Sequence, residues 1–206
     1  MFLKSRDREK LLRKEDWPRF TQPDVKIYEI SELRKLRQAA NNSTELLLVD
    51  FLLGSGFRLS EMCHAEYQDI DWTAKTIRVQ AKPKYGFNTK TWESRTVPLS
   101  DELIKALAQH RKTAKTALIV PGKYDRPMSK CTPKRMIKDI AERAGIRANA
   151  DIKTFRSTFA TMRITIHSFQ NVQQFCDHKN PQTTMRYLRV ANLTSKETPH
   201  QYEQDV

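Results

Sequence analysis

The longest apolar stretch of the chain, residues 46–53, does most to limit what the chain can fold into. It reads Leu-Leu-Leu-Val-Asp-Phe-Leu-Leu, far short of the ~18 apolar residues that a membrane-spanning helix needs. Asn42 with Glu45 three residues later has the pattern of a capping box at a helix start. Gly54-Ser55-Gly56 would end that helix. The segment therefore predicts a helix buried in the core of a globular domain.

The other periodic segments predict further helices and one small sheet. Residues 76–81 alternate as a strand should, and residues 92–99 look like its antiparallel partner across a long basic loop. Helices are expected after Ser31, at about 60–67, after Ser100, from Thr132, at 153–165, around Val172 and Phe175, and from Asn180-Pro181 onward. The expected fold class is mainly α with a small antiparallel β-sheet (α+β).

We expect one domain at residues 25–195. Residues 1–24 are polar and carry both charge signs, so they are interpreted as a basic linker or the remnant of an N-terminal arm. Residues 196–206 are expected to form a polar C-terminal tail. The amino terminus lacks the apolar core of a signal peptide, and we expect a cytoplasmic protein.

The charge balance indicates a polyanionic partner. The chain has 37 Lys and Arg against 24 Asp and Glu, for a net charge of +13. Nucleic acid is the commonest partner for such an excess, and an acidic membrane surface is the alternative. The cysteines are an odd number and widely spaced, at Cys63, Cys131 and Cys176, so they predict reduced thiols and neither a disulfide framework nor a zinc site.

Cutting DNA with a side-chain nucleophile makes four demands on a protein. Arginine forks must neutralise the phosphate, and the leaving oxygen needs a proton donor. A tyrosine nucleophile, with a free pKa near ~10, needs a base or a strong field. Positive charge must hold the transition state. Because every basic protein contains arginines and tyrosines, only an ordered set at fixed spacing is informative.

Four segments supply such a set. In order and spacing they resemble the boxes of tyrosine recombinases of the phage-integrase family over about residues 30–190. Residues 56–61 resemble the G-x-R-x-S-E box, and residues 90–99 resemble a hairpin with a lysine five residues before the Arg of R-x-V-P-L. Residues 153–161 resemble H-x-x-R-x-T-F-A-T, and residues 178–187 resemble H-x(5)-T-M-R-Y.

The resemblance implies a role for each matching residue. Arg58 and Arg156 would clamp the non-bridging oxygens of the scissile phosphate. Lys90 would protonate the leaving 5′ oxygen, although Lys82 and Lys84 compete with it in the same loop. His178 would hydrogen-bond the phosphate. Tyr187 would attack phosphorus and form a 3′-phosphotyrosine that stores the energy of the broken bond, so neither a metal nor another cofactor is expected.

Three positions depart from the family pattern. Lys153 stands where the family usually has His, on the same helix face as Arg156. It can bind phosphate, or act as a base if clustered positive charge lowers its pKa. Ile166 stands where many members have a helix-ending glycine, and Asp177 replaces the glycine before the His.

Asp177 puts a carboxylate beside His178, close to the expected phosphate. At about 6 Å and an effective dielectric of ~20 the repulsion is roughly 3 kcal/mol before screening. Pairing of Asp177 with Lys153 or Lys179 would oppose this effect, as would a raised pKa of His178. We expect repulsion to dominate.

The resemblance implies the catalytic-domain fold of DNA breaking–rejoining enzymes. The expected function is site-specific recombination or integration of double-stranded DNA by a homo-oligomer, a tetramer on DNA. Two alternatives stay open: a truncated, weakly active or non-catalytic DNA-binding remnant, and a type IB topoisomerase. Residues 1–24 are too short for the family's N-terminal clamp domain, so we expect a catalytic fragment or a natural truncation that recombines poorly alone.

Overall fold

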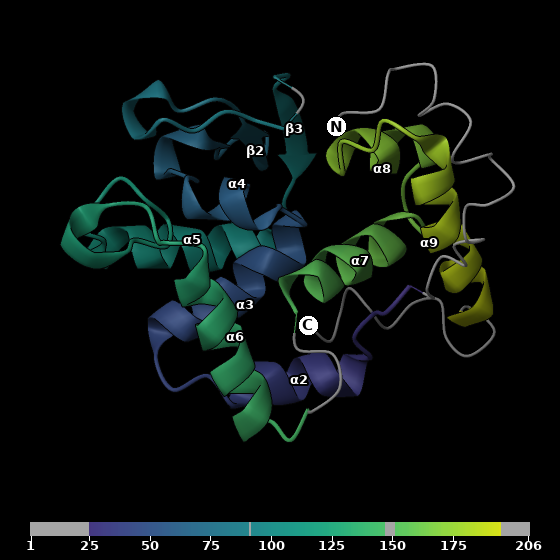
Figure 1. The fold of residues 1–206 in the computed structure, drawn as a ribbon, viewed down its shortest axis with the longest axis horizontal. Helices are drawn as coiled ribbons and strands as arrows, with labels where there is room; N and C mark the ends of the chain where they lie inside the picture. The colour runs from purple at the N-terminus through teal and green to yellow at the C-terminus, as the bar shows by residue number, and fades with distance from the viewer. Residues whose placement is uncertain (1–24, 91, 147–150, 195–206) are drawn as a thin grey trace, which may run out of the picture.

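The computed structural model describes residues 25–90, 92–146 and 151–194 (Figure 1). The expected segments 1–24 and 196–206 lie outside these residues. The α-helices are α2 (Ile30–Gln38), α3 (Ser43–Ser55), α4 (Leu59–Cys63), α5 (Asp101–Thr113), α6 (Cys131–Arg143), α7 (Ile152–Arg163), α8 (Phe169–Phe175) and α9 (Pro181–Thr194). The strands are β1 (Ile70–Asp71), β2 (Thr76–Val79) and β3 (Arg95–Pro98).

Helix α3 contains the apolar stretch and lies in the middle of the helices. It packs against α2, α5, α6 and α7, and most of its residues from Leu47 to Leu53 are buried. The Asn42 side chain accepts a hydrogen bond from the Glu45 backbone N–H at 2.9 Å, and Gly56 ends the helix in a left-handed conformation. The predicted buried helix is therefore confirmed. None of the described helices is long and apolar enough to cross a membrane.

The strands form one antiparallel sheet in the order β1-β2-β3. The predicted hairpin of β2 and β3 is confirmed, with Ile77 opposite Val97 and both side chains buried. Strand β1 was not predicted, because a two-residue strand is too short to show alternation. The predicted strands, residues 76–81 and 92–99, are longer than the observed β2 and β3. The pairing of β2 with β3 stops where the basic loop begins.

The helix expected at about 60–67 ends earlier, at Cys63. The chain after it pairs with a distant segment: the Tyr67 N–H donates to the Ala117 carbonyl and the Ile119 N–H donates to the Ala65 carbonyl. Because these backbone groups bond to a distant segment, they do not make the hydrogen bonds of a helix. Tertiary pairing therefore ends the helix early.

The carboxy-terminal helices close the fold around one junction. Helix α9 packs on α7 and α8, while α8 also contacts β3. Figure 1 shows α7, α8 and α9 on one side of α3 and α4, with β3 passing close to α8. This arrangement brings the start of α4, the middle of α7 and the segment between α8 and α9 together.

Candidate active site

Four of the six predicted site residues meet at this junction. Arg58 from the start of α4 and Arg156 from α7 both donate to the carbonyl of Cys176, Arg58 through Nη2 at 3.5 Å. His178 follows two residues after Cys176, and its ring stacks on that of Tyr187 at a centroid distance of 5.5 Å. Lys153 is exposed in the first turn of α7, and Lys90 is exposed in the hairpin loop.

The position of Arg58 depends on a close approach of α3 to α7. Gly56 has φ +59°, and a Cβ atom there would lie 2.2 Å from Cδ1 of Phe159. The Gly56 carbonyl accepts a hydrogen bond from Arg156 Nη1 at 2.8 Å. Glycine in the first box therefore lets the backbone before Arg58 touch the helix that carries Arg156.

Glu61, itself paired with Arg95, holds Arg58 in place, a role that the sequence interpretation missed. Arg95 forms a two-point ion pair with Glu61, through Nη1 at 2.9 Å and Nη2 at 2.6 Å. Arg58 Nη1 donates to the same carboxylate at 2.9 Å. Burial favours a raised pKa for Glu61, but hydrogen bonds and charge from Arg95 and Arg58 lower that pKa to about 2. Both residues belong to the family boxes, which was the available signal.

His178 is neutral near pH 7. Burial, followed by the charges of Arg156 and Arg58, lowers its pKa to about 3. Asp177 acts in the opposite direction, but burial and the arginines outweigh it, so the raised pKa considered from the sequence is wrong. The Nδ1 atom lies 3.0 Å from the hydroxyl of Thr184, which is fully buried.

The three lysines of the hairpin loop differ in their surroundings. Lys82 is buried, with Nζ at 2.7 Å from Glu66 and 2.5 Å from Asp69. Lys84 also pairs with Glu66, at 2.5 Å. Lys82 and Lys84 are thus engaged at the base of the hairpin, whereas Lys90 is exposed.

Ile166 and Asp177, the other two departures from the family pattern, differ in backbone conformation. Ile166 has no positive φ and its side chain is 48% exposed, so replacing a glycine there causes no backbone strain. Asp177 has φ +48°, the left-handed region that favours glycine. Its carboxylate accepts a hydrogen bond from Arg58 Nη1 at 2.8 Å. The ion pair of Asp177 with Arg58 was not among the pairings expected from the sequence.

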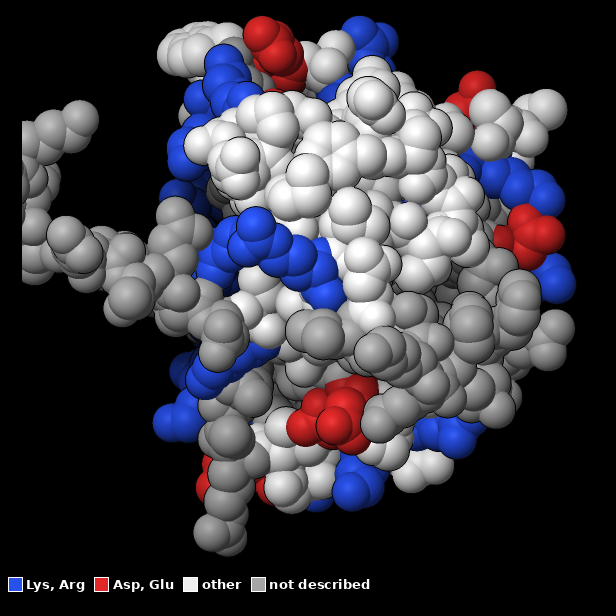
Figure 2. Space-filling model, turned by 90° about the vertical axis from the view of Figure 1, so that its right-hand side faces the viewer, with Lys and Arg blue, Asp and Glu red and all other residues white. Residues whose placement is uncertain are grey.

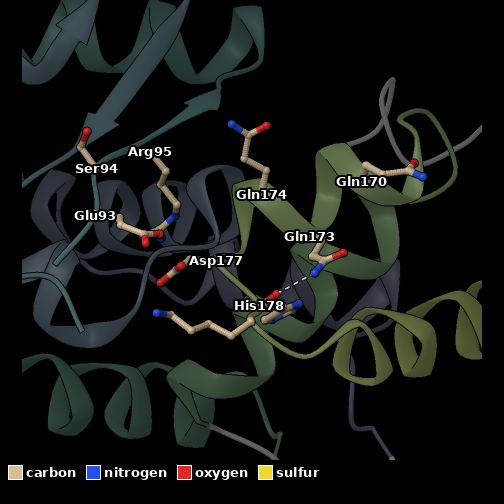
Figure 3. A pocket seen from close by; sticks show the side chains of 9 residues that line it. Glu93, Ser94, Arg95, Gln170, Gln173, Gln174, Asp177 and His178 are labelled. Carbon is tan, nitrogen blue, oxygen red and sulfur yellow. Dashed lines mark hydrogen bonds between the residues drawn. The ribbon is translucent and has the colours of Figure 1, made fainter. Parts of the chain in front are cut away.

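A cavity of about 330 Å³ opens beside this cluster. Figure 3 shows Asp177 and His178 on one wall, with Glu93 and Arg95 from the hairpin nearby and three glutamines of α8 around the rim. Its lining is Glu93, Ser94, Arg95, Gln170, Gln173, Gln174, Asp177, His178 and Lys179. The Gln173 amide donates to the His178 carbonyl at 2.9 Å, which fixes the backbone before α9.

Basic side chains gather beside an uncharged face. Figure 2 shows Lys and Arg residues along one edge of the side that carries α8 and α9, next to a wide uncharged area. Helix α8, with the sequence FQNVQQF, carries no charge. Within the three described ranges, no group of three or more His, Cys, Asp or Glu residues is arranged to hold a metal ion.

Clustered arginines, a neutral histidine and a tyrosine on a neighbouring helix can bind a phosphate and present a hydroxyl to it. The model of the phage integrase family matches residues 26–193. The chain therefore belongs to the phage integrase family.

Known relatives agree with this assignment. Tyrosine recombinase XerA of Saccharolobus solfataricus is 26% identical over 196 residues, covering 88% of this chain and 62% of the relative. The chain thus spans less than two thirds of that relative. The crystal structure of XerA recombinase superposes with a TM-score of 0.70 at 22% identity, covering 87% of this chain and 68% of the other. The Tn1549 transposon integrase in complex with a circular intermediate DNA has a TM-score of 0.68 at 18% identity, covering 88% and 69%.

Proposed function

We propose that the chain cuts and rejoins double-stranded DNA at specific sites, through a covalent bond between Tyr187 and a 3′ phosphate. The observation that carries the proposal is the meeting of Arg58, Arg156, His178 and Tyr187 at one junction, in a member of the phage integrase family. These residues come from segments far apart in the chain, so their proximity is a property of the fold.

The proposed reaction is a phosphoryl transfer in two reversible steps. The Tyr187 hydroxyl gives up its proton to water as its oxygen attacks phosphorus and the bond from phosphorus to the 5′ oxygen breaks. Lys90 supplies the proton that the leaving oxygen takes up. The phosphate is then esterified to Tyr187. Attack by a 5′ hydroxyl of a second strand reverses the step and rejoins DNA. Arg58 and Arg156 offset the charge on the non-bridging oxygens.

Neutral His178 and basic Lys153 have supporting roles in this proposal. The Nε2 atom of His178 is available for a hydrogen bond to a phosphate oxygen or to the Tyr187 hydroxyl, because Nδ1 is engaged by Thr184. Lys153 lies one turn before Arg156 and is exposed, so it suits contact with the DNA backbone. The arginines and lysines supply the positive charge, and the proposed reaction uses neither a metal ion nor another cofactor.

The proposed partner is duplex DNA, bound by a homo-tetramer in the cytoplasm. The net charge of +13 and the DNA held by the Tn1549 integrase structure support the DNA partner. Recombination joins two duplexes, each cut on two strands, which requires four nucleophiles. A tetramer supplies one Tyr187 from each chain.

The test is covalent trapping on a nicked duplex that prevents rejoining, followed by denaturing electrophoresis. Wild type is expected to form an adduct, with and without a chelator. Tyr187→Phe is expected to form none and still bind DNA, because only the hydroxyl is lost. Tyr124→Phe, on a side chain that is 91% exposed, is the matched control and should behave as wild type. An adduct with Tyr187→Phe would assign the nucleophile to another residue, Tyr202 being the next candidate.

One observation favours a second candidate, a domain that binds DNA without cutting it. Asp177 occupies donors of Arg58 that a phosphate needs. DNA binding with no adduct from wild type on any nicked duplex would support this candidate. Relaxation of supercoiled DNA without joining of two sites would instead indicate a topoisomerase.

A further inference from the structure

Asp177 binds Arg58 in the way that a phosphate would. Its carboxylate Oδ2 accepts from Arg58 Nη1 at 2.8 Å, and its backbone carbonyl accepts from Nη2 at 2.9 Å. Both terminal nitrogens of the guanidinium therefore donate to one residue. Two-point binding of this kind is how an arginine fork recognises two oxygens of a phosphate.

The backbone at Asp177 does not need a carboxylate. Helix α8 ends in a turn in which the Asp177 N–H donates to the Gln174 carbonyl and the His178 N–H donates to the Gln173 carbonyl, both at 3.0 Å. This is the Schellman pattern, whose left-handed position is usually glycine. With φ +48°, Asp177 occupies that position although glycine fits it better. The side chain adds the contact with Arg58, which the turn itself does not require.

The two carboxylates on Arg58 differ in their burial and in their surroundings. Glu61 is buried and held by both terminal nitrogens of Arg95. The Asp177 side chain is 13% exposed and lines the cavity, which gives it room to turn away (Figure 3). An incoming anion that competes for Arg58 will displace Asp177 and leave Glu61 in place.

The charge of the cluster adds to this competition. Arg58, Arg95 and Arg156 face Glu61 and Asp177, which leaves a net charge of +1 with neutral His178. A phosphodiester carries one negative charge. Displacing Asp177 from Arg58 would leave both anions near one guanidinium, and this repulsion raises the cost of loading the site.

We infer that Asp177 is an internal competitor of the scissile phosphate for Arg58, and that it must turn into the cavity before the phosphate can bind. The inference rests on the proposed function for the identity of the phosphate. It makes Asp177 a specificity-determining residue: only DNA whose other contacts hold the phosphate firmly at the junction displaces the carboxylate. The simple repulsion expected from the sequence thereby becomes direct competition for the Nη1 donor of Arg58.

The experiment measures phosphate binding separately from cleavage. Inorganic phosphate is titrated into the full chain at low and moderate salt, and the Arg58 side-chain N–H signals are followed by NMR. Asp177→Asn removes the charge, and Asp177→Gly removes the side chain while suiting the left-handed turn. Asp125→Asn is the matched control, because Asp125 is exposed and has φ +57° outside the cavity.

We expect both Asp177 variants to bind phosphate on the order of tenfold tighter at low salt, with a smaller gain at higher salt. Asp125→Asn should match wild type. Folded Asp177 variants with unchanged or weaker phosphate binding would overturn the inference and make Asp177 a residue that positions Arg58.

A second readout on the same proteins is adduct yield on the nicked duplex. Tighter phosphate binding with a higher adduct yield supports both proposals. Tighter binding with no adduct from any variant or from wild type supports the competitor role and counts against cleavage. The two failures are therefore distinguishable.

Discussion

At the scale of single residues, the surroundings of His178 fix its chemical state. Burial and nearby arginines lower its pKa to about 3, so the imidazole carries one proton near pH 7. The Thr184 hydroxyl, 3.0 Å from Nδ1, then decides which nitrogen holds that proton. If Thr184 donates to Nδ1, Nε2 carries the proton and can donate to a phosphate oxygen. In that arrangement Thr184 would be a positioning residue that acts through His178.

Thr184→Val tests this role, because valine keeps the shape and loses the hydroxyl. We expect adduct formation to slow roughly tenfold. This corresponds to about 1.4 kcal/mol, the contribution of one hydrogen bond. Thr184→Ser keeps the hydroxyl and should retain most of the rate. ¹⁵N shifts of the His178 ring should show a changed tautomer in the valine variant only. Equal rates and equal shifts in both variants would remove Thr184 from the mechanism.

At the scale of elements, the base of the β2–β3 hairpin is fixed by charge. Buried Lys82 is paired with Glu66 and Asp69, and Tyr85 and Lys84 also contact Glu66. The exposed part of the loop that carries Lys90 is thereby attached to a rigid base. The same loop thus contains a buried, paired lysine, Lys82, and an exposed one, Lys90, for which we propose a role in cleavage.

Exchanging each lysine for methionine distinguishes these roles. Lys82→Met removes the buried cation that pairs with both Glu66 and Asp69, and it should lower the free energy of unfolding by about 3 kcal/mol. Lys90→Met should change it by less than about 0.5 kcal/mol but slow cleavage roughly a hundredfold. A substrate with a 5′ bridging sulfur, which leaves without a proton, should restore cleavage by Lys90→Met. Failure of that rescue would show that Lys90 is not the proton donor.

The junction of α3 with α7 gives a second prediction at this scale. Gly56→Ala places a Cβ 2.2 Å from Phe159 and imposes a left-handed alanine, so we expect a loss of about 3 kcal/mol or more in unfolding free energy. Gly86→Ala is the matched control, with φ +63° and nothing within 4 Å of the added atom. It should cost only about 1 kcal/mol. Similar losses in urea denaturation would show that backbone strain, not the contact, matters at Gly56.

At the scale of the whole molecule, buried titratable groups make stability depend on pH. Against opposing burial, Arg95 and Arg58 hold the pKa of Glu61 at about 2, and Lys82 and Lys84 do the same for Glu66. Burial lowers the pKa of His178 to about 3. All three values lie below those of the unfolded chain, so the unfolded state takes up protons first as the pH falls.

We therefore expect stability to be fully present above about pH 6.5 and to decline in two stages. His178 contributes the loss from about 6.5 downward, and the two glutamates add to it from about 4.5 toward 2. Glu61 contributes on the order of 3 kcal/mol to the free energy of unfolding, because each pKa unit corresponds to about 1.4 kcal/mol. Urea denaturation at pH 7, 5.5, 4 and 3 measures this. Glu61→Gln should be less stable at pH 7 with a shallower acid decline, and a wild-type profile that is flat down to pH 3 would contradict the assignment.

The sequence by itself determined the helices that local signals define. Asn42 and Ser100 accept the capping hydrogen bonds expected of them, and Gly145 ends α6 with φ +71°. Caps and hydrophobic periodicity act within one or two turns, so they can be identified without the rest of the chain. The ordered family boxes in turn indicated that Arg58, Arg156, His178 and Tyr187 belong to one site.

Only the tertiary structure decided which charges meet. Asp177 pairs with Arg58 across 119 positions of sequence, and Glu61 pairs with Arg95 across 34. Lys82, apparently equivalent to Lys90 in the loop, is buried against two carboxylates. Electrostatic interactions depend on distance in space and on exclusion of water, and both are set by the fold, which places α8 against β3 and Arg95 of β3 beside Glu61 of α4. The spacing of residues along the chain contains neither quantity.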